Sequence, residues 1–99
     1  MLFNVKLTDY AFLLKSELNF KMESDKTFQD IKDLFFNTLK EKNIEYDEIY
    51  YKNFQIVTFG RVVKMNEPLE MYSDAYDLVL KVNIIINDEF INKIISPLK

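Results

Sequence analysis

Apolar and polar residues alternate over two segments near the start of the chain. The first segment covers residues 3–7, and the second repeats the alternation over residues 14–23. A period of two is typical of half-buried strands, so the two segments predict a hairpin joined by residues 9–13. Tyr10 and Phe12 stand at its tip, where they either fold back over the edge of the core or contact a partner.

The period changes to that of a helix after Thr27. Apolar residues then recur at spacings of three and four along one helical face, at Phe28, Ile31, Phe35 and Leu39. Such a stripe faces a core, and Thr27 with Asp30 resembles a capping box, so the pattern predicts a helix over residues 28–42. Phe36 lies off the stripe and is either a flanking residue or an exposed contact.

Three further strands are predicted in the second half of the chain. Residues 54–59 form one strand, which Gly60 ends, and residues 62–63 form a brief second one. A turn or short helical element follows at residues 67–69, where proline is tolerated at the first helical position. The last strand covers residues 77–86, with every second residue apolar on one face. The predicted order is strand, strand, helix, strand, short strand, strand.

Composition excludes most catalytic sites. The 99 residues include no His, no Cys and a single Gly. These absences leave no Cys/His zinc site, no Ser-His-Asp triad, no thiol nucleophile and no glycine-rich phosphate loop. Carboxylate pairs such as Asp30 and Asp33 fall at caps or on a solvated helix face, which favours structural roles over acid–base catalysis. We therefore expect a protein that is not an enzyme and that holds no cofactor and no metal.

Charge and hydropathy limit the partners. Lys and Arg number 13 against 16 Asp and Glu, the net charge is −3, and Arg61 is the single arginine, so direct nucleic-acid contact is disfavoured. Tyr46, Tyr50 and Tyr51 lie in a polar connector without basic runs, which favours packing over the helix end rather than stacking on bases. No apolar stretch approaches the ~20 residues of a membrane span, and the lack of Cys favours an intracellular location, cytoplasmic or nuclear.

Three blocks of the sequence then carry a likeness to a known family. They are residues 20–32 (FKMESDKTFQDIK), residues 55–63 (QIVTFGRVV) followed by Leu69 and Tyr72, and residues 77–82 (DLVLKV). They resemble, in this order, the second strand and helix cap, the third and fourth strands, and the final strand of ubiquitin and the ubiquitin-like family. The resemblance implies an α+β, β-grasp domain over residues 1–86, with a mixed sheet of four to five strands and one main helix packed on one face. Extra residues fall in the first hairpin and between the helix and the third strand.

The resemblance also implies a recognition patch on the solvent face of the sheet. Val57 falls at the position of the family's central isoleucine, and Val79 and Lys81 fall on the matching face of the last strand. Arg61 occupies the place of the family's chain-linking lysine. These four residues are the candidate contacts for a protein partner. The alternative is that Val57 and Val79 form only a modest exposed cross-strand pair.

Residues 87–99 are predicted to form a separate amphipathic tail with a short helix. Its apolar side chains share one side of that helix, and they are Phe90, Ile91, Ile94 and Ile95. These residues dock either on their own domain or in a groove of a partner. Conjugated members of the family end in Gly-Gly, whereas no glycine follows Gly60, so we expect a protein that is not conjugated.

Two functions follow from these observations. The first is a non-catalytic ubiquitin-like interaction module, or adaptor, that binds protein partners through its sheet face or its tail. The second is a fixed structural subunit of a large intracellular assembly, such as a ribonucleoprotein, anchored through residues 87–99. An enzyme is a distant third.

Overall fold

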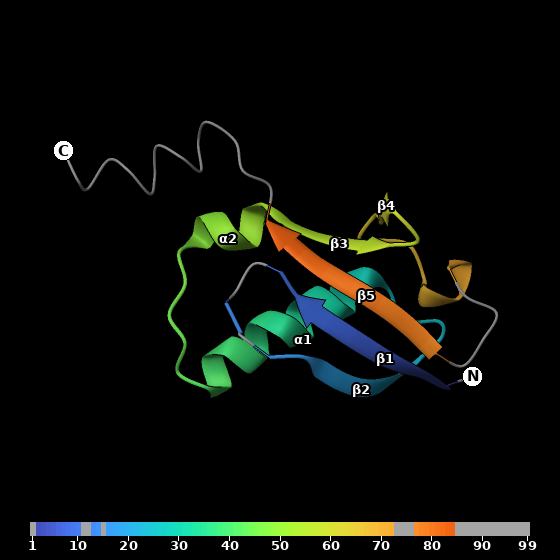
Figure 1. The fold of residues 1–99 in the computed structure, drawn as a ribbon, viewed down its shortest axis with the longest axis horizontal. Helices are drawn as coiled ribbons and strands as arrows, with labels where there is room; N and C mark the ends of the chain where they lie inside the picture. Colours follow the sequence, from blue (N-terminus) through green and yellow to red (C-terminus); the bar gives the residue numbers. More distant parts are fainter. Residues whose placement is uncertain (1, 11–12, 15, 73–76, 85–99) are drawn as a thin grey trace.

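A single mixed sheet organises the computed structural model, which describes residues 2–10, 13–14, 16–72 and 77–84. Its strands are β1 (Leu2–Asp9), β2 (Leu18–Glu23), β3 (Phe54–Thr58), β4 (Arg61–Val62) and β5 (Asp77–Ile84). The helices are α1 (Phe28–Glu41), α2 (Glu48–Lys52) and the 3₁₀ helix η1 (Leu69–Met71). Figure 1 shows α1 lying across one face of the sheet, with α2 beyond its end beside β3.

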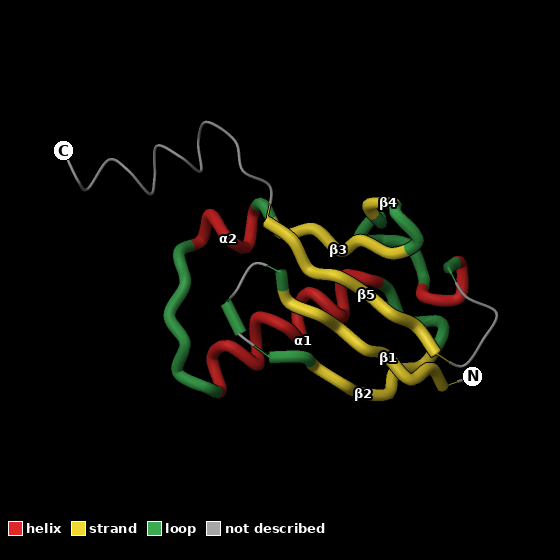
Figure 2. The backbone as a smooth tube through the Cα atoms, viewed as in Figure 1, coloured by secondary structure: helices red, strands yellow, loops and turns green. Residues whose placement is uncertain are grey.

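The strand order is β2-β1-β5-β3-β4. Each neighbouring pair is antiparallel except β1 and β5, which run parallel. A parallel pair needs a long crossover, and the chain between β1 and β5 supplies it by way of α1. Figure 2 shows β5 in the middle of the sheet, between β1 and β3. The predicted α+β fold, with a mixed sheet and one main helix, is confirmed.

The core lies between α1 and the inward face of the sheet. Alternate residues of β1, β3 and β5 are buried, and the stripe predicted on α1 is buried at all four positions. The fully buried side chains include Phe3, Leu7, Phe28, Ile31, Phe35, Leu39, Ile56, Leu78 and Leu80. Burying each such side chain is worth roughly 1.5–3 kcal/mol before the loss of conformational entropy, so this layer accounts for the register of the strands.

The ends of α1 follow the local sequence. The backbone N–H of Thr27 donates to Asp30 Oδ2 at 2.9 Å, as a capping box requires. The helix ends at Glu41, with Lys42 as the C-cap. Asn43 then has φ +58°, a left-handed conformation that asparagine tolerates better than most residues. The predicted helix is therefore right to within one residue at its end.

The connector after α1 holds a helix that the sequence pattern does not predict. Asp47 caps α2 by accepting the N–H of Ile49 at 3.0 Å, and Ile49 is buried. The buried Asn53 amide donates to the Ile49 carbonyl at 2.8 Å. Five residues are too few to show a helical period, so this region was expected to be an irregular connector.

Phe36 is neither a flank nor an exposed contact. It is only 3% exposed, because rings from the segment after α1 cover it. Its centroid lies 4.8 Å from that of Tyr46, 5.0 Å from that of Tyr51 and 5.2 Å from that of Phe54. The expected packing of the connector tyrosines over the helix is thereby confirmed for Tyr46 and Tyr51, which both lie against Phe36.

Several strand boundaries differ from the prediction. β1 covers Leu2–Asp9 rather than residues 3–7, and β3 ends at Thr58 rather than at residue 59. β2 begins at Leu18 rather than at residue 14, although Leu14 is still buried. Its N–H donates to the Asp9 carboxylate at 2.6 Å, which holds this part of the loop against the core without strand pairing. β4 covers Arg61–Val62 rather than residues 62–63. Of the two tip residues, Tyr10 is 51% exposed, and Phe12 lies outside the described residues, as does the predicted tail.

Candidate protein-binding surface

The solvent face of the sheet brings three of the sequence-predicted site residues together. Val57 on β3 pairs directly with Lys81 on β5, and directly opposed residues of an antiparallel pair project to the same side. Val79 lies two residues before Lys81 on that side and is 56% exposed. Val57 is half-buried. These three side chains therefore form one continuous surface on the face that α1 does not cover.

Arg61 does not share this surface. It pairs with Thr58, which is buried on the inward side of β3, whereas Val57 pairs with Val62. The positive charge of Arg61 instead favours the ionised forms of Glu67 and Tyr72, which lie on the segment that follows β4. The structure thus places Arg61 on the other side of the hairpin from the surface to which it was assigned.

Glu67 and Tyr72 form a polar contact beside Arg61. The Tyr72 hydroxyl donates to Glu67 Oε1 at 2.6 Å, and the Lys64 N–H donates to the same oxygen at 2.8 Å. These two hydrogen bonds, that of Tyr72 first, lower the pKa of the Glu67 carboxyl. The bond to Glu67 is the main cause that raises the pKa of the Tyr72 hydroxyl. These hydrogen bonds join the segment between β4 and η1 to Tyr72, the residue that follows η1.

Two further apolar residues of the surface were missed from the sequence. Val62 is 53% exposed and pairs with Val57, and Phe59 is 75% exposed at the turn between β3 and β4. The sequence signal for Phe59 was its place before Gly60, since two residues between paired strands form a tight turn. We call Val57, Phe59, Val62 and Val79 the hairpin patch.

The turn at Phe59 is conformationally costly. Phe59 has φ +51° and Gly60 has φ +71°, as a type I′ hairpin turn requires, and such turns favour Asn, Asp and Gly at both positions. A left-handed conformation costs an ordinary residue roughly 1–2 kcal/mol. The chain therefore keeps a large apolar side chain in a conformation that disfavours it and in contact with water.

The hairpin patch borders a shallow hollow. A depression of about 380 Å³ is lined by Val57, Phe59 and Val79, with Asp77 and Lys81 at its polar edge. A second hollow of about 380 Å³ continues between Val57, Lys81 and Tyr10. The Lys81 ammonium lies 5.8 Å from the centre of the Tyr10 ring. The surface thus combines apolar side chains with a cation and an aromatic ring.

The described residues contain no cluster of three or more His, Cys, Asp or Glu side chains able to hold a metal ion. Within that same part of the chain, no helix is both long and apolar enough to span a membrane. The predicted tail contacts, Phe90, Ile91, Ile94 and Ile95, lie outside the described residues.

The comparisons with known proteins support the fold. No family model matches the chain, and no curated protein matches it. Among solved structures, the chain is similar to a ubiquitin of the archaeon Caldiarchaeum subterraneum, with a TM-score of 0.62 and 14% sequence identity. That match covers 89% of this chain and 99% of the archaeal one. The chain therefore has a ubiquitin-like β-grasp fold.

Proposed function

We propose that this protein is a non-catalytic ubiquitin-like module that binds a protein partner through the hairpin patch and is not itself conjugated. The observation that carries the proposal is Phe59. It is 75% exposed and holds a left-handed backbone conformation at the tip of the β3–β4 turn. Both features disfavour phenylalanine in the isolated domain, and a contact that buries the ring accounts for its presence.

The patch around Phe59 supports the same function. Val57, Val62 and Val79 surround the turn with apolar area, and residues of this kind exclude water around an aromatic anchor. Lys81 pairs with Val57 at the margin. We expect the partner to present an apolar pocket for Phe59 and a carboxylate within reach of Lys81.

Two facts about the sequence support the negative parts of the proposal. The chain has no His and no Cys, so the common nucleophile and base pairs are absent from it. Its one glycine is Gly60 in the β3–β4 turn, so the 99 residues contain no Gly-Gly pair for conjugation.

The test is a comparison of co-purified proteins between the wild type and patch variants. Phe59→Asn suits the turn and removes the ring, whereas Val57→Asp puts a charge at the centre of the patch. Met71→Asn is the matched control, because Met71 is an exposed apolar residue on η1 that does not line the hollow. We expect both patch variants to lose a partner that the wild type and the control retain. Retention of every partner by folded Phe59→Asn and Val57→Asp would refute the proposal.

A further inference from the structure

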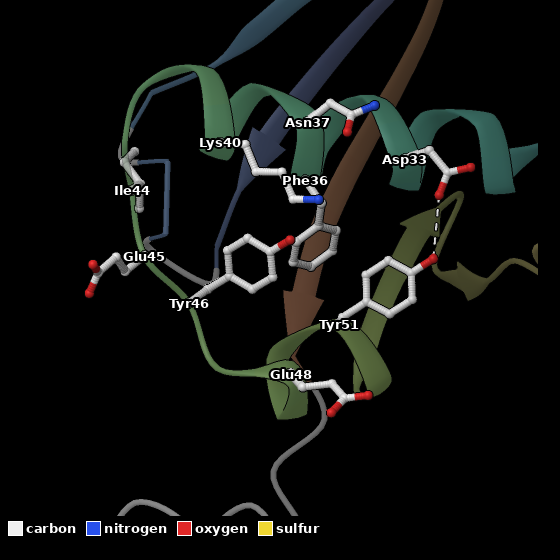
Figure 3. Close-up of a pocket in the computed structure, with 9 residues that line it drawn as sticks. All are labelled: Asp33, Phe36, Asn37, Lys40, Ile44, Glu45, Tyr46, Glu48 and Tyr51. Carbon is white, nitrogen blue, oxygen red and sulfur yellow. Dashed lines mark hydrogen bonds between the residues drawn. The ribbon is translucent and has the colours of Figure 1, made fainter.

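A wide hollow lies on the helical side of the sheet, between α1, α2 and the segment that joins them (Figure 3). It measures about 910 Å³. Phe36 and Asp33 contribute from α1, Tyr46 from the joining segment, and Tyr51 and Glu48 from α2 (Figure 3). Five of the nine lining residues belong to the chain between α1 and β3, and they are Ile44, Glu45, Tyr46, Glu48 and Tyr51.

The floor of the hollow is aromatic. The rings of Tyr46 and Tyr51 are inclined to that of Phe36 by 58° and 63°, with centroids 4.8 and 5.0 Å away. Phe36 is buried beneath them, whereas Tyr46 and Tyr51 are half-buried, and the exposed face of a tyrosine ring attracts cations. The Lys32 ammonium already lies 3.8 Å from the centre of the Tyr51 ring, and Lys32 is not among the residues that line the hollow. The Tyr51 ring therefore already makes a cation–π contact within this protein.

The rim of the hollow is acidic. Asp33, Glu45 and Glu48 line it, against a single cation, Lys40. Three carboxylates and one ammonium give the lining a formal charge of −2. Asp33 is held in place, since its Oδ1 accepts hydrogen bonds from Gln29 at 3.0 Å and from the Tyr51 hydroxyl at 3.4 Å (Figure 3). A negative rim over an aromatic floor is complementary to a cationic group with a flat, polarisable face.

We propose that this hollow, which we call the α1–α2 pocket, binds an arginine side chain of a basic peptide. A planar guanidinium stacks on aromatic faces and donates in-plane hydrogen bonds to carboxylates. An ammonium is a compact point charge and cannot form the same stacked, bidentate arrangement. Lys40 is the chain's own competitor for the site, because its ammonium is the one positive charge in the lining. The site does not depend on the hairpin patch, so it extends the proposed function rather than resting on it.

The test is a titration of the full chain, followed by amide chemical shifts, with the peptide acetyl-Gly-Arg-Arg-Gly-amide. The norleucine analogue is the uncharged control, and the lysine analogue separates the guanidinium from simple charge. We expect the arginine peptide to shift residues of the joining segment and α2 with a Kd on the order of 1 mM, and the lysine peptide to bind less tightly. Added salt should weaken both, because the rim is exposed to solvent.

Variants of opposite charge make the test decisive. Glu45→Gln and Glu48→Gln should each raise Kd by about two- to fivefold, and Lys40→Gln should lower it by a similar factor. All three residues are exposed, so the fold is retained. Phe59→Asn should leave peptide binding unchanged, which separates this site from the hairpin patch. The proposal is overturned if the arginine peptide shifts no pocket residue, if the norleucine peptide binds as tightly, or if the charge variants leave Kd unaltered.

Discussion

The hairpin patch and the α1–α2 pocket are built in opposite ways. The patch rests on strand register, since Val57 meets Val62 and Lys81 across two antiparallel pairs. The pocket rests on tertiary packing, because Phe36 is buried under rings from a separate segment. A residue of the patch is therefore free to change without loss of the core, whereas the floor of the pocket belongs to the core. The following predictions test this difference, beginning with the largest effect.

Truncation of Phe36 should destabilise the whole domain. Phe36→Ala removes a side chain that is 3% exposed and lies against four other rings. Buried Phe→Ala substitutions cost about 3–5 kcal/mol, and urea unfolding followed by circular dichroism measures the change. Val57→Ala, in the patch, should cost much less, because Val57 is only half-buried. Equal losses for the two variants would contradict the contrast between the surfaces.

Replacement of Phe59 should raise the stability of the fold rather than lower it. Phe59→Asn places a residue that tolerates the left-handed conformation at φ +51°, and it should stabilise the fold by about 0.5–1 kcal/mol. The same variant should lose the partner, so stability and binding change in opposite directions. The measurement is again the urea midpoint, with Val62→Asn as a control that leaves the turn conformation alone. A destabilised Phe59→Asn would show that the ring contributes to the fold.

The contact between Glu67 and Tyr72 should give a smaller, pH-dependent effect. The pKa of Glu67 lies below its ordinary value of 4.5 in the folded state, so the stability from this contact is present above about pH 4.5 and is lost as the pH falls through the folded pKa. The pKa of Tyr72 lies above its ordinary value of 10.0, so the same stability is lost again as the pH rises through that folded value.

Unfolding midpoints measured from about pH 6 to about pH 2 check the acid side of this prediction. Glu67→Gln should flatten the dependence, and Tyr72→Phe should flatten it on both the acid and the alkaline side. Glu70→Gln is the control, because Glu70 is an exposed carboxylate on η1, close in sequence to Glu67. A steep acid dependence that survives in Glu67→Gln would assign the effect to other carboxylates.

The sequence predicts those elements whose burial is periodic. Every second residue is buried in β1 and β5, and one stripe is buried on α1. The order of apolar and polar residues alone predicts these patterns. α2 has only five residues, too few to show a helical period. Phe36 lies off the stripe of α1, and it is buried because Tyr46 and Tyr51, from a later segment, cover it. Tertiary packing decides both, and the α1–α2 pocket was accordingly invisible in the sequence.

The side of the sheet on which a residue lies depends on the length of the turn before it. Two residues between Thr58 and Arg61 place Val62, and not Arg61, opposite Val57. A shift of one residue in a strand moves every side chain to the other face. The resemblance to ubiquitin-like proteins placed Val57, Val79 and Lys81 on one face, as the structure does. It assigned Arg61 to the same face by position alone, which the strand register contradicts, and it did not single out Phe59.

The central place of β5 has a consequence for synthesis. It is the last described strand along the chain, yet it joins β1 to β3. Until Asp77–Ile84 has left the ribosome, a nascent chain holds two hairpins whose facing edges have no partner. Exposed strand edges invite pairing with other chains. The sheet can therefore be completed only after β5 has been translated. Chains released before Asp77 should aggregate rather than fold.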